Sequence, residues 1–425
     1  MSNQNTPFRV AVVGGGLGGL SVAVGLLRRG IPVDVYEANP EFRETGLGLG
    51  IGPAAHRALP LIDEKLGETY DAMVTTHETS TGNPDDRTIW FRATTGYGER
   101  SGNIFHTQRA LPSGLTSVRR SDFLGALVNL IPKECTHLSK KFVDLKQHDD
   151  GVTMYFEDGT TAEADYVIGC DGIKSRVKTA LFPDEPNKPA YSGMYGYRAL
   201  IPMDVMEETI GDAARYATWH LAPGKYVIHY PIAHAKELNV GFYTLHDKWE
   251  DESWVREGSR EDMENDFAQM TGAVPKILKL MPSPSQWAIF QNPPIQTYAK
   301  DSVAIIGDAA HATSPHMGAG AGQAIEDAYV LVEMLADPRL KERRHVQAAL
   351  QAYDLVRRPR SQKVVQKSHE NAKALCLMAP GIGTDEEKLR DLWTDNFHWL
   401  WDLDMKAHAE SARSILTELL AKTSP

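Results

Sequence analysis

Uninterrupted apolar runs open the chain and recur near residues 166 and 303. Val10 to Val13 is the first such run, and three glycines follow it directly. A short run of small and β-branched residues is typical of a buried strand in a parallel sheet. Helical periodicity then extends from Leu17 to Arg29, ends at Gly30, and is followed by a second strand over 32–37. This order of strand, helix and strand predicts a dinucleotide-binding unit of the α/β class.

A different pattern, with a period of two, dominates residues 191–290. Strand-like runs separated by turn residues are followed by a capped helical stretch over about 259–280. The runs cover 192–202, 214–222, 225–232 and 237–245. Several consecutive strands of this kind predict a mainly antiparallel sheet inserted into the α/β framework. Residues 76–114 indicate only loops and edge strands.

The remaining segments complete the predicted domain organisation. Residues 301–306 again resemble a buried parallel strand, and the tail from Pro359 onward is helical and rich in tryptophan. Such a terminal helix more often packs against the body of the protein or a second subunit than binds a ligand. We predict a dinucleotide-binding domain in two parts, a substrate-binding sheet domain and C-terminal helices. Their ranges are 1–190 with 291–370, then 191–290, and finally 371–425.

Composition and charge restrict the classes of function. The 425 residues are 42% apolar and 24% charged, as is ordinary for a globular protein with a large core. The formal net charge is −11 and no long basic run occurs, which argues against a nucleic-acid partner. No run approaches the roughly 18 apolar residues of a membrane span. The polar first nine residues lack the apolar core of a signal peptide, so we expect a cytoplasmic protein. For its oligomeric state we expect a monomer or a homodimer.

The cysteines add to this expectation. Cys135, Cys170 and Cys376 are widely separated in the sequence. This spacing suggests neither a disulfide framework nor a metal site, and it favours a reducing compartment.

The glycines after the first strand fit the spacing G-x-G-x-x-G. Gly14 permits a tight turn, Gly16 lets a pyrophosphate approach the backbone, and Gly19 lets the helix pack closely on the strand. Glu37, at the end of the second strand, lies where a carboxylate can accept hydrogens from an adenosine ribose. The acid and the complete strand–helix–strand unit make this signal much stronger than a glycine pattern alone.

Two further glycine-rich segments have the chemistry of a cofactor site. Asp308 follows the strand at 301–306, and a turn of alternating glycine and alanine over 318–322 precedes a helix. A carboxylate at a strand end can hold sugar hydroxyls, and free N–H groups at a helix start favour an anion. The glycine-rich stretch 42–53 fits either the close approach of a flat ligand or strand, or a flexible surface connection.

Three motifs in this order resemble those of the group A flavoprotein monooxygenases, which are FAD-dependent aromatic hydroxylases. They are the glycine fingerprint at 14–19, CDGIKSRVK at 170–178 and GDAAHATSPHMGAGAGQAIEDA at 307–328. The similarity is greatest to the salicylate-hydroxylase-like branch, which includes fungal enzymes acting on phenolic polyketides, and it covers roughly residues 8 to 370. It implies a Rossmann-like FAD-binding domain with an inserted antiparallel substrate domain and a C-terminal helical region.

The resemblance also implies roles for individual residues. Those matching the adenosine-diphosphate half of the FAD site are Gly14, Gly16, Leu17, Gly19 and Glu37. Arg120 matches a family arginine that contacts FAD. Asp171 and Gly172 match a motif that serves both FAD and the nicotinamide cofactor. Those matching the ribityl chain and the flavin ring are Asp308, Pro315, Gly318, Gly320, Ala321 and Gly322. Gly50 belongs to the flavin-side loop, where LGLGI at 47–51 departs from the family's commoner G-A-G-I.

The implied reaction consumes NADH or NADPH and O2. Reduced FAD forms a flavin C4a-hydroperoxide that hydroxylates a phenolic or aromatic acid substrate, with decarboxylation and dearomatisation left open. Ring attack is easiest on a phenolate, so a nearby cation or base assists it. The candidate side chains are Arg198, Tyr226, His229, Tyr230 and His316. Arg198 could instead form a salt bridge at the surface, and His316 could instead have a structural role. We expect His311 to be structural.

The alternation in KYVIHYPI puts Tyr226 and Tyr230 on one face of their strand and His229 on the other. The sequence does not say which face meets the pocket. Two other functions compete with hydroxylation. One is a flavin oxidase or dehydrogenase that inserts no oxygen, and the other is a non-catalytic binding protein on the same fold, as in prenylated-GTPase escort proteins.

Overall fold

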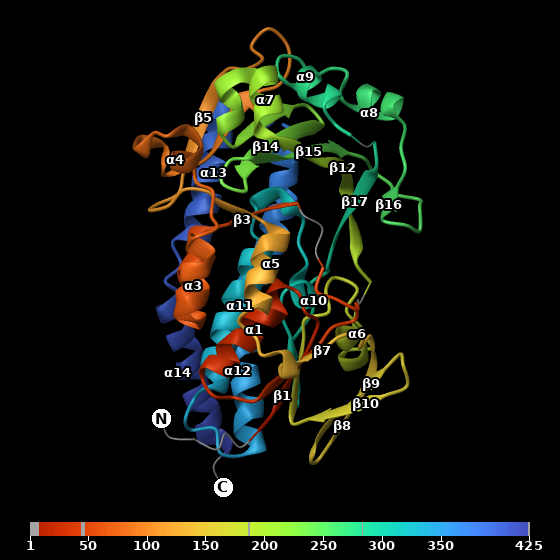
Figure 1. Ribbon diagram of the computed structural model, residues 1–425, viewed down its shortest axis with the longest axis vertical. Coiled ribbons are helices and arrows are strands. Elements are labelled where there is room, and N and C mark those ends of the chain that lie inside the picture. The colour runs from red at the N-terminus through yellow and green to blue at the C-terminus, as the bar shows by residue number, and fades with distance from the viewer. Residues whose placement is uncertain (1–7, 44–46, 186–187, 283, 424–425) are drawn as a thin grey trace.

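The computed structural model describes residues 8–43, 47–185, 188–282 and 284–423. The polar start of the chain up to residue 7 and part of the glycine-rich stretch, 44–46, lie outside these ranges. In Figure 1 a parallel sheet with long helices occupies the lower half of the molecule, and a large, mostly antiparallel sheet occupies the upper half.

The lower sheet has the strand order β18-β19-β11-β1-β2-β7. Its pairs are parallel except for β18 with β19. The strands are β1 (Val10–Val13), β2 (Val33–Tyr36), β7 (Thr136–His137), β11 (Tyr166–Gly169), β18 (Ala299–Lys300) and β19 (Val303–Ile305). All of β1, β11 and β19 is buried, as the apolar runs predicted.

The upper sheet has the order β16-β17-β12-β15-β14-β13-β4-β5 and is antiparallel except between β13 and β4. Its strands are β4 (Ile89–Thr95), β5 (Ile104–Arg109), β12 (Ala190–Pro202), β13 (Thr218–Ala222), β14 (Lys225–Ile232), β15 (Glu237–Leu245), β16 (Val255–Arg256) and β17 (Gln286–Gln291). β4 lies inside this sheet, between β13 and β5, although its sequence indicated only loops and edge strands. Its pairing partner β13 follows more than a hundred residues later, and short-range patterns contain no signal for such a contact.

Two smaller sheets complete the β-structure. β8 (Phe142–His148), β9 (Gly151–Phe156) and β10 (Thr161–Ala164) form successive hairpins, and an Asp-Gly pair lies at each connection. β3 (Gly48–Ile51) pairs with β6 (Thr116–Arg119). The glycine-rich stretch is therefore, in its described part, a strand next to another strand rather than a flexible connection.

The helices surround the lower sheet, and some of them cover the side of the upper sheet that faces away from the lower one (Figure 1). The α-helices are α1 (Leu17–Arg28), α2 (Pro53–Ile62), α3 (Glu64–Asp71), α4 (His77–Thr81), α5 (Arg120–Val128), α6 (Arg176–Leu181), α7 (Met203–Ile210), α8 (Arg260–Phe267), α9 (Val274–Lys279), α10 (Asp308–His311), α11 (Gly320–Leu335), α12 (Arg343–Leu375), α13 (Glu386–Trp401) and α14 (Met405–Thr423). The 3-10 helices are η1 (Pro84–Asp86), η2 (Lys133–Cys135), η3 (Gly211–Arg215) and η4 (Pro315–Met317).

The single helical stretch predicted over 259–280 is wrong. Ser259 does cap α8 through a capping box, but α8 ends at Phe267 and α9 begins at Val274. Gly272, between them, has a φ of +70°, which a right-handed helix does not allow. Pro275 then lies in the first turn of α9, where its missing N–H costs nothing.

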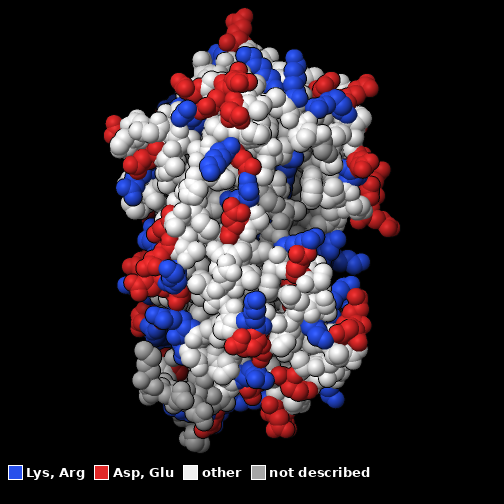
Figure 2. Space-filling view, viewed as in Figure 1, with Lys and Arg blue, Asp and Glu red and all other residues white. Residues whose placement is uncertain are grey.

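The terminal helix α13 packs against the body of the protein, in agreement with the first of the two predicted alternatives. Trp393 and Trp401 are buried, and Trp393 meets Trp219 of β13 with ring centroids 5.7 Å apart. No helix within the described ranges has an apolar stretch long enough to cross a membrane. On the face drawn in Figure 2, acidic and basic side chains are interspersed.

Candidate active site

The first cavity lies at the carboxyl ends of β1, β2 and β11 and has a volume of about 500 Å³. This end of a parallel sheet is where open α/β folds bind their ligands. Ten of the residues predicted to bind FAD line the cavity: Gly14, Gly16, Leu17, Glu37, Arg120, Asp171, Gly172, Asp308, Gly320 and Ala321. The fold therefore collects residues that are up to three hundred positions apart in the chain.

Gly14 and Gly19 have the backbone roles that their spacing predicted. Gly14 has a φ of +110°, and a Cβ there would lie 2.4 Å from the carbonyl oxygen of Cys170. A Cβ on Gly19 would lie 2.1 Å from the carbonyl oxygen of Gly14, so Gly19 holds α1 close to β1 and lies outside the cavity. A Cβ on Gly16 would meet no described atom within 4 Å, which leaves its backbone open toward the cavity.

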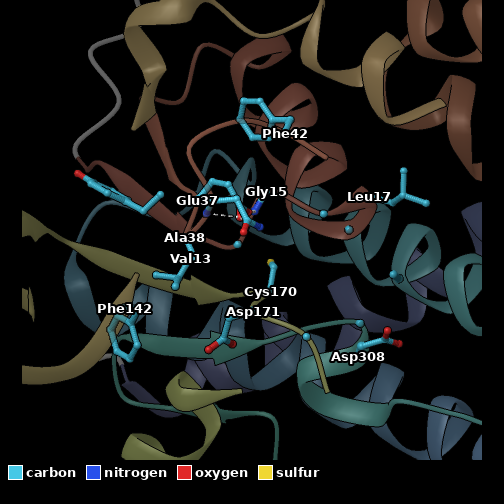
Figure 3. Close-up of a pocket in the computed structure, with 18 of the residues that line it drawn as sticks. Val13, Gly15, Leu17, Glu37, Ala38, Phe42, Phe142, Cys170, Asp171 and Asp308 are labelled. Carbon is cyan, nitrogen blue, oxygen red and sulfur yellow. Dashed lines mark hydrogen bonds between the residues drawn. The ribbon is translucent and has the colours of Figure 1, made fainter. Parts of the chain in front are cut away.

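Three carboxylates of this cavity occupy different environments (Figure 3). Glu37 accepts a 2.8 Å hydrogen bond from the backbone N–H of Gly15, drawn as a dashed line. Asp171 accepts from the N–H of Arg176 at 2.7 Å and from Ser175 Oγ at 2.5 Å, so it also holds the start of α6. Burial raises the pKa of Asp171, although these hydrogen bonds oppose the change. Asp308 is exposed to the cavity at the start of α10.

Buried charges anchor the turn before Asp308. His311 Nε2 lies 2.5 Å from Asp327 Oδ2, and Arg357 Nε donates to Asp327 Oδ1 at 2.8 Å. Asp327 also accepts from the N–H of Gly307 at 3.0 Å. Burial alone raises the pKa of Asp327, but His311 and Arg357 outweigh it and lower that pKa. His311 thus faces α11 and α12 instead of either cavity.

The second cavity, of about 410 Å³, lies between the upper sheet and the segment 312–321. The predicted residues that line it are Gly50, Arg120, Arg198, Tyr226, Tyr230, Asp308, Pro315, His316, Gly318, Gly320 and Ala321. Four of these also line the first cavity: Arg120, Asp308, Gly320 and Ala321. The two cavities therefore adjoin at these four residues.

The tyrosine face of β14 is the face that meets the second cavity. Tyr226 and Tyr230 line it, whereas His229 lies on the opposite face. There His229 Nδ1 lies 3.4 Å from His220 Nε2, and His229 Nε2 lies 3.2 Å from the carbonyl oxygen of Ala213. Gly322, like His229 and Gly19, lies outside both cavities. A Cβ on it would lie 3.2 Å from that of Ala55 on α2, so it allows two helices to approach.

Arg198 and His316 bring polar groups to the part of this cavity that the tyrosines line. Arg198 lies among tyrosines, with its guanidinium carbon 5.9 Å from the ring centre of Tyr243, and Tyr243 raises its pKa. His316 Nδ1 lies 2.7 Å from the hydroxyl of Tyr226. Burial, and then His369 and Arg198, lower the pKa of His316 to about 3, so its imidazole is neutral near pH 7. Among the described residues, Arg198 Nε and His316 Nε2 have no hydrogen-bond partner.

Sequence reasoning missed several residues of this cavity. Asn239 and Tyr243 of β15 line it, as do Trp90, Phe91 and Trp219 at its aromatic end. Tyr243 pairs with Tyr226 across β14 and β15, and their rings stack with centroids 5.0 Å apart. The alternation of β15 contained this information, but only the strand register shows which of its faces is shared with Tyr226.

The described residues fit an FAD molecule. No described side chain caps the start of α1 or of α11, so the free N–H groups of both helices remain available to an anion beside the cavities. Lys174 and Arg176 line the first cavity together with the open backbone at Gly16. Adjoining cavities, one with a carboxylate and helix N-termini beside it and the other with aromatic walls, match a dinucleotide with a flat ring system.

This fold and this site define the class of dinucleotide-binding flavoenzymes. Over residues 7–368 the chain matches the family model described as FAD binding domain, and it belongs to that family. It is 37% identical to a 6-methylsalicylate 1-monooxygenase of Aspergillus terreus, over 98% of this chain and 94% of that protein. It is 32% identical to a salicylate hydroxylase of Pseudomonas putida, over 97% and 96% of the two chains.

A solved structure, a salicylate hydroxylase substrate complex, has a TM-score of 0.85 to this chain. The two are 31% identical, and the comparison covers 96% of this chain and 98% of that one. The predicted fold class and family resemblance are thereby confirmed. The chain is an FAD-dependent monooxygenase that uses NAD(P)H and O2, and the reading as an oxidase without oxygen insertion is not favoured.

Proposed function

We propose that the enzyme hydroxylates a small phenolic or aromatic acid substrate, which binds in the second cavity. The observation that carries this proposal is the junction of the two cavities at Arg120, Asp308, Gly320 and Ala321. This junction puts the aromatic walls and the polar side chains of the second cavity next to one end of the cofactor space. The substrates named for the similar salicylate and 6-methylsalicylate enzymes support the same substrate class.

The first cavity holds FAD in this proposal. Gly14, Gly16, Leu17 and Glu37 bind the adenosine-diphosphate half, and Asp308 binds the ribityl chain. The backbone of the turn from Gly318 to Ala321 would hold the flavin ring, and the small residues of this turn would leave room for it. Bound FAD, reduced by NADH or NADPH, activates O2 so that one oxygen atom is transferred to the substrate.

Arg198 holds the anionic oxygen of the substrate, either its carboxylate or its phenolate. A buried guanidinium without a hydrogen-bond partner on Nε is costly unless a ligand supplies one. Tyr226 and His316 receive the phenolic proton, because the tyrosine hydroxyl lies 2.7 Å from Nδ1 of a neutral imidazole, which accepts there when its own hydrogen is on Nε2. The aromatic walls keep water away from the reacting oxygen.

The proposal also divides the chain by function. Residues 1–190 and 291–370 form the FAD-binding part, 191–290 the substrate-binding part, and 371–425 the terminal helices. β4 and β5, from the first of these ranges, extend the substrate-binding sheet. Trp90 and Phe91 of β4 line the substrate cavity, so the FAD-binding range also contributes to substrate binding.

Product mass tests the reaction. The holoenzyme is incubated with NADH or NADPH, ¹⁸O₂ and a panel of phenols that includes salicylate and 6-methylsalicylate. We expect at least one phenol to stimulate NAD(P)H oxidation and to gain one labelled oxygen atom. A product that has lost two hydrogens and gained no label would contradict hydroxylation.

FAD retention tests the cofactor site separately. Asp308→Ala removes the carboxylate proposed to bind the ribityl chain, and we expect FAD affinity to fall roughly tenfold or more. The yellow flavin absorbance that remains after gel filtration measures this loss. Asp144→Ala, on the exposed strand β8, is the matched control. Unchanged FAD retention and turnover in Asp308→Ala would contradict the assignment of the first cavity.

A further inference from the structure

Asn239 of β15 is the one carboxamide among the described residues that line the second cavity. A carboxamide carries an acceptor and two donor hydrogens, so the way it is held decides which of them a ligand meets. The backbone N–H of Gly48, in β3, donates to Asn239 Oδ1 at 2.9 Å. Because a backbone N–H can only donate, this bond assigns the orientation of the amide. Asn239 Nδ2 keeps both hydrogens and has no hydrogen-bond partner among the described residues.

Contacts with β3 and β14 hold the amide in this orientation before any ligand binds. A Cβ on Gly48 would lie 2.7 Å from that of Asn239 and 2.9 Å from the hydroxyl oxygen of Tyr230, so β3 packs directly on both side chains. Tyr230 is also the cross-strand partner of Asn239. Two residues earlier on β15, Glu237 forms an ion pair with Arg119 of β6. The pair of strands β3 and β6 is therefore attached to β15 at two points.

The strand register puts Asn239 next to Arg198 on the cavity face. Arg198 pairs with Gly241 across β12 and β15, and Asn239 lies two residues from Gly241 on the same face. Side chains in this relation are diagonal neighbours, roughly 7–8 Å apart along the sheet. Gly241 puts no side chain between them. Since both residues line the second cavity, their donors serve the same space.

Two neighbouring donors of this kind suit a carboxylate better than a single hydroxyl. Arg198 Nε has no hydrogen-bond partner among the described residues, and Asn239 Nδ2 supplies a second donor beside it. A carboxylate has two oxygens that both accept, so it satisfies both donors at once. A plain phenol has one oxygen and leaves one donor unpaired in a desolvated cavity, which costs binding energy.

We propose that Asn239 is a specificity-determining residue that selects substrates with a carboxylate beside the phenolic oxygen. This inference rests on the proposed function and narrows its substrate class to 2-hydroxy aromatic acids. One carboxylate oxygen accepts from Arg198 and the other from Asn239 Nδ2. The phenolic oxygen is thereby left to Tyr226 and His316, whose hydroxyl and imidazole lie 2.7 Å apart at the far end of β14 from Tyr230.

The test uses two ligands that differ only in the carboxylate, 6-methylsalicylate and 3-methylphenol. Each is titrated into the oxidised holoenzyme without NADH or NADPH, and the change in the flavin absorbance spectrum gives its Kd. The value of kcat/KM for each ligand is measured alongside. We expect the wild type to bind the acid roughly tenfold or more tightly than the phenol.

Two variants separate the donor from the bond that holds it. Asn239→Leu removes both, whereas Asn239→Asp keeps an acceptor for the N–H of Gly48 but replaces the donor with a carboxylate oxygen. We expect both variants to bind 6-methylsalicylate roughly 10- to 100-fold more weakly, and to bind 3-methylphenol within about threefold of wild type. Asn265→Asp, the same substitution at an exposed position of α8, is the control and keeps both wild-type Kd values.

The outcomes separate this inference from the function on which it rests. Equal weakening of both ligands would show that Asn239 only shapes the cavity, and it would overturn the inference. Wild-type discrimination in Asn239→Asp would also overturn it, because that variant has no donor. A wild type that binds and hydroxylates the acid and the phenol equally well would overturn it and leave the hydroxylase proposal intact. A wild-type holoenzyme that hydroxylates no compound in the panel would contradict the proposed function and this inference with it.

Discussion

On the far face of the upper sheet, the hydroxyls of Tyr195 and Tyr197 both donate to Asp266, at 2.8 and 2.7 Å. Gln286 Nε2 donates to the hydroxyl of Tyr197 at 2.8 Å and completes this network. On the cavity face, Arg198 follows Tyr197 directly in the chain. Arg198 Nε nevertheless has no hydrogen-bond partner among the described residues. The buried tyrosine hydroxyls of the far face are thus hydrogen-bonded, whereas Arg198 Nε on the cavity face has no partner among the described residues.

This difference shows how one strand can serve both stability and chemistry. A satisfied buried network holds the helices of the far face and stabilises the fold. An unpaired buried donor costs about 1–3 kcal/mol, so the cavity face is less stable than it could be until a ligand supplies the missing acceptor. Substitutions on the far face should therefore change stability, and those on the cavity face should change turnover.

The largest expected effect is that of Arg198→Gln on the cavity face. Removing the cation that pairs with a desolvated substrate anion should cost about 2–4 kcal/mol, or roughly 30- to 1000-fold in kcat/KM. Steady-state kinetics with the stimulating phenol measure this loss, and Arg198→Lys, which keeps the charge, should lose less. A kcat/KM within twofold of wild type would support the surface-salt-bridge alternative for Arg198.

On the far face, Tyr197→Phe should destabilise the protein by about 1–3 kcal/mol, because Asp266 and Gln286 each lose a buried partner. The midpoint of urea unfolding of the holoenzyme measures this change. The KM for the phenol should stay at the wild-type value. An altered KM with unchanged stability would reverse the assignment of the two faces.

The buried histidines of the far face predict a loss of stability in acid. Burial lowers the pKa of His229 to about 4, whereas an exposed histidine in the unfolded chain titrates near 6.5. Between these values the unfolded chain binds more protons, so stability falls with decreasing pH by up to about 1.4 kcal/mol per pH unit for this group. His229→Gln should flatten the fall of the unfolding midpoint between pH 6.5 and 4.5. His398→Gln, at an exposed histidine of α13, is the control and should keep the wild-type slope.

The smallest expected effect is that of Tyr230→Phe on the cavity face. Burial raises the pKa of Tyr230, so its hydroxyl stays neutral and contributes at most an uncharged hydrogen bond. Such a bond is worth about 0.5–1.5 kcal/mol, which corresponds to roughly a two- to twelvefold rise in the KM for the phenol. Steady-state kinetics measure this rise. A loss larger than that of Arg198→Gln would mean that Tyr230, and not Arg198, holds the charged group of the substrate.

Much of the cofactor half was predictable from the sequence. Gly14, Gly16 and Gly19 occupy the positions that their spacing predicted, and ten of the predicted cofactor residues line one cavity. The sequence was sufficient here because the glycines act through their own backbone within a few residues of a strand end. Gly322 shows the limit of this reasoning, since it lies in the predicted turn but faces α2.

The substrate half was predictable only in outline. The alternation placed Tyr226 and Tyr230 together and His229 opposite them, but both arrangements of the sheet were consistent with that pattern. The strand order, with β4 beside β13 and β15 beside β14, decided which face closes over the cavity. That order arises from pairings between distant segments, which no local period records.

The sequence by itself therefore determined the strand–helix–strand unit, the glycine turns, the family and the alternation of the inserted strands, because each follows from neighbouring residues. Only the tertiary structure decided that Arg198, Tyr243 and His316 line one cavity, and that Asp308 lines both cavities. Arg198 and His316, for example, are more than a hundred residues apart in the chain. The cavities form only when the packing of helices and sheets brings such distant elements together.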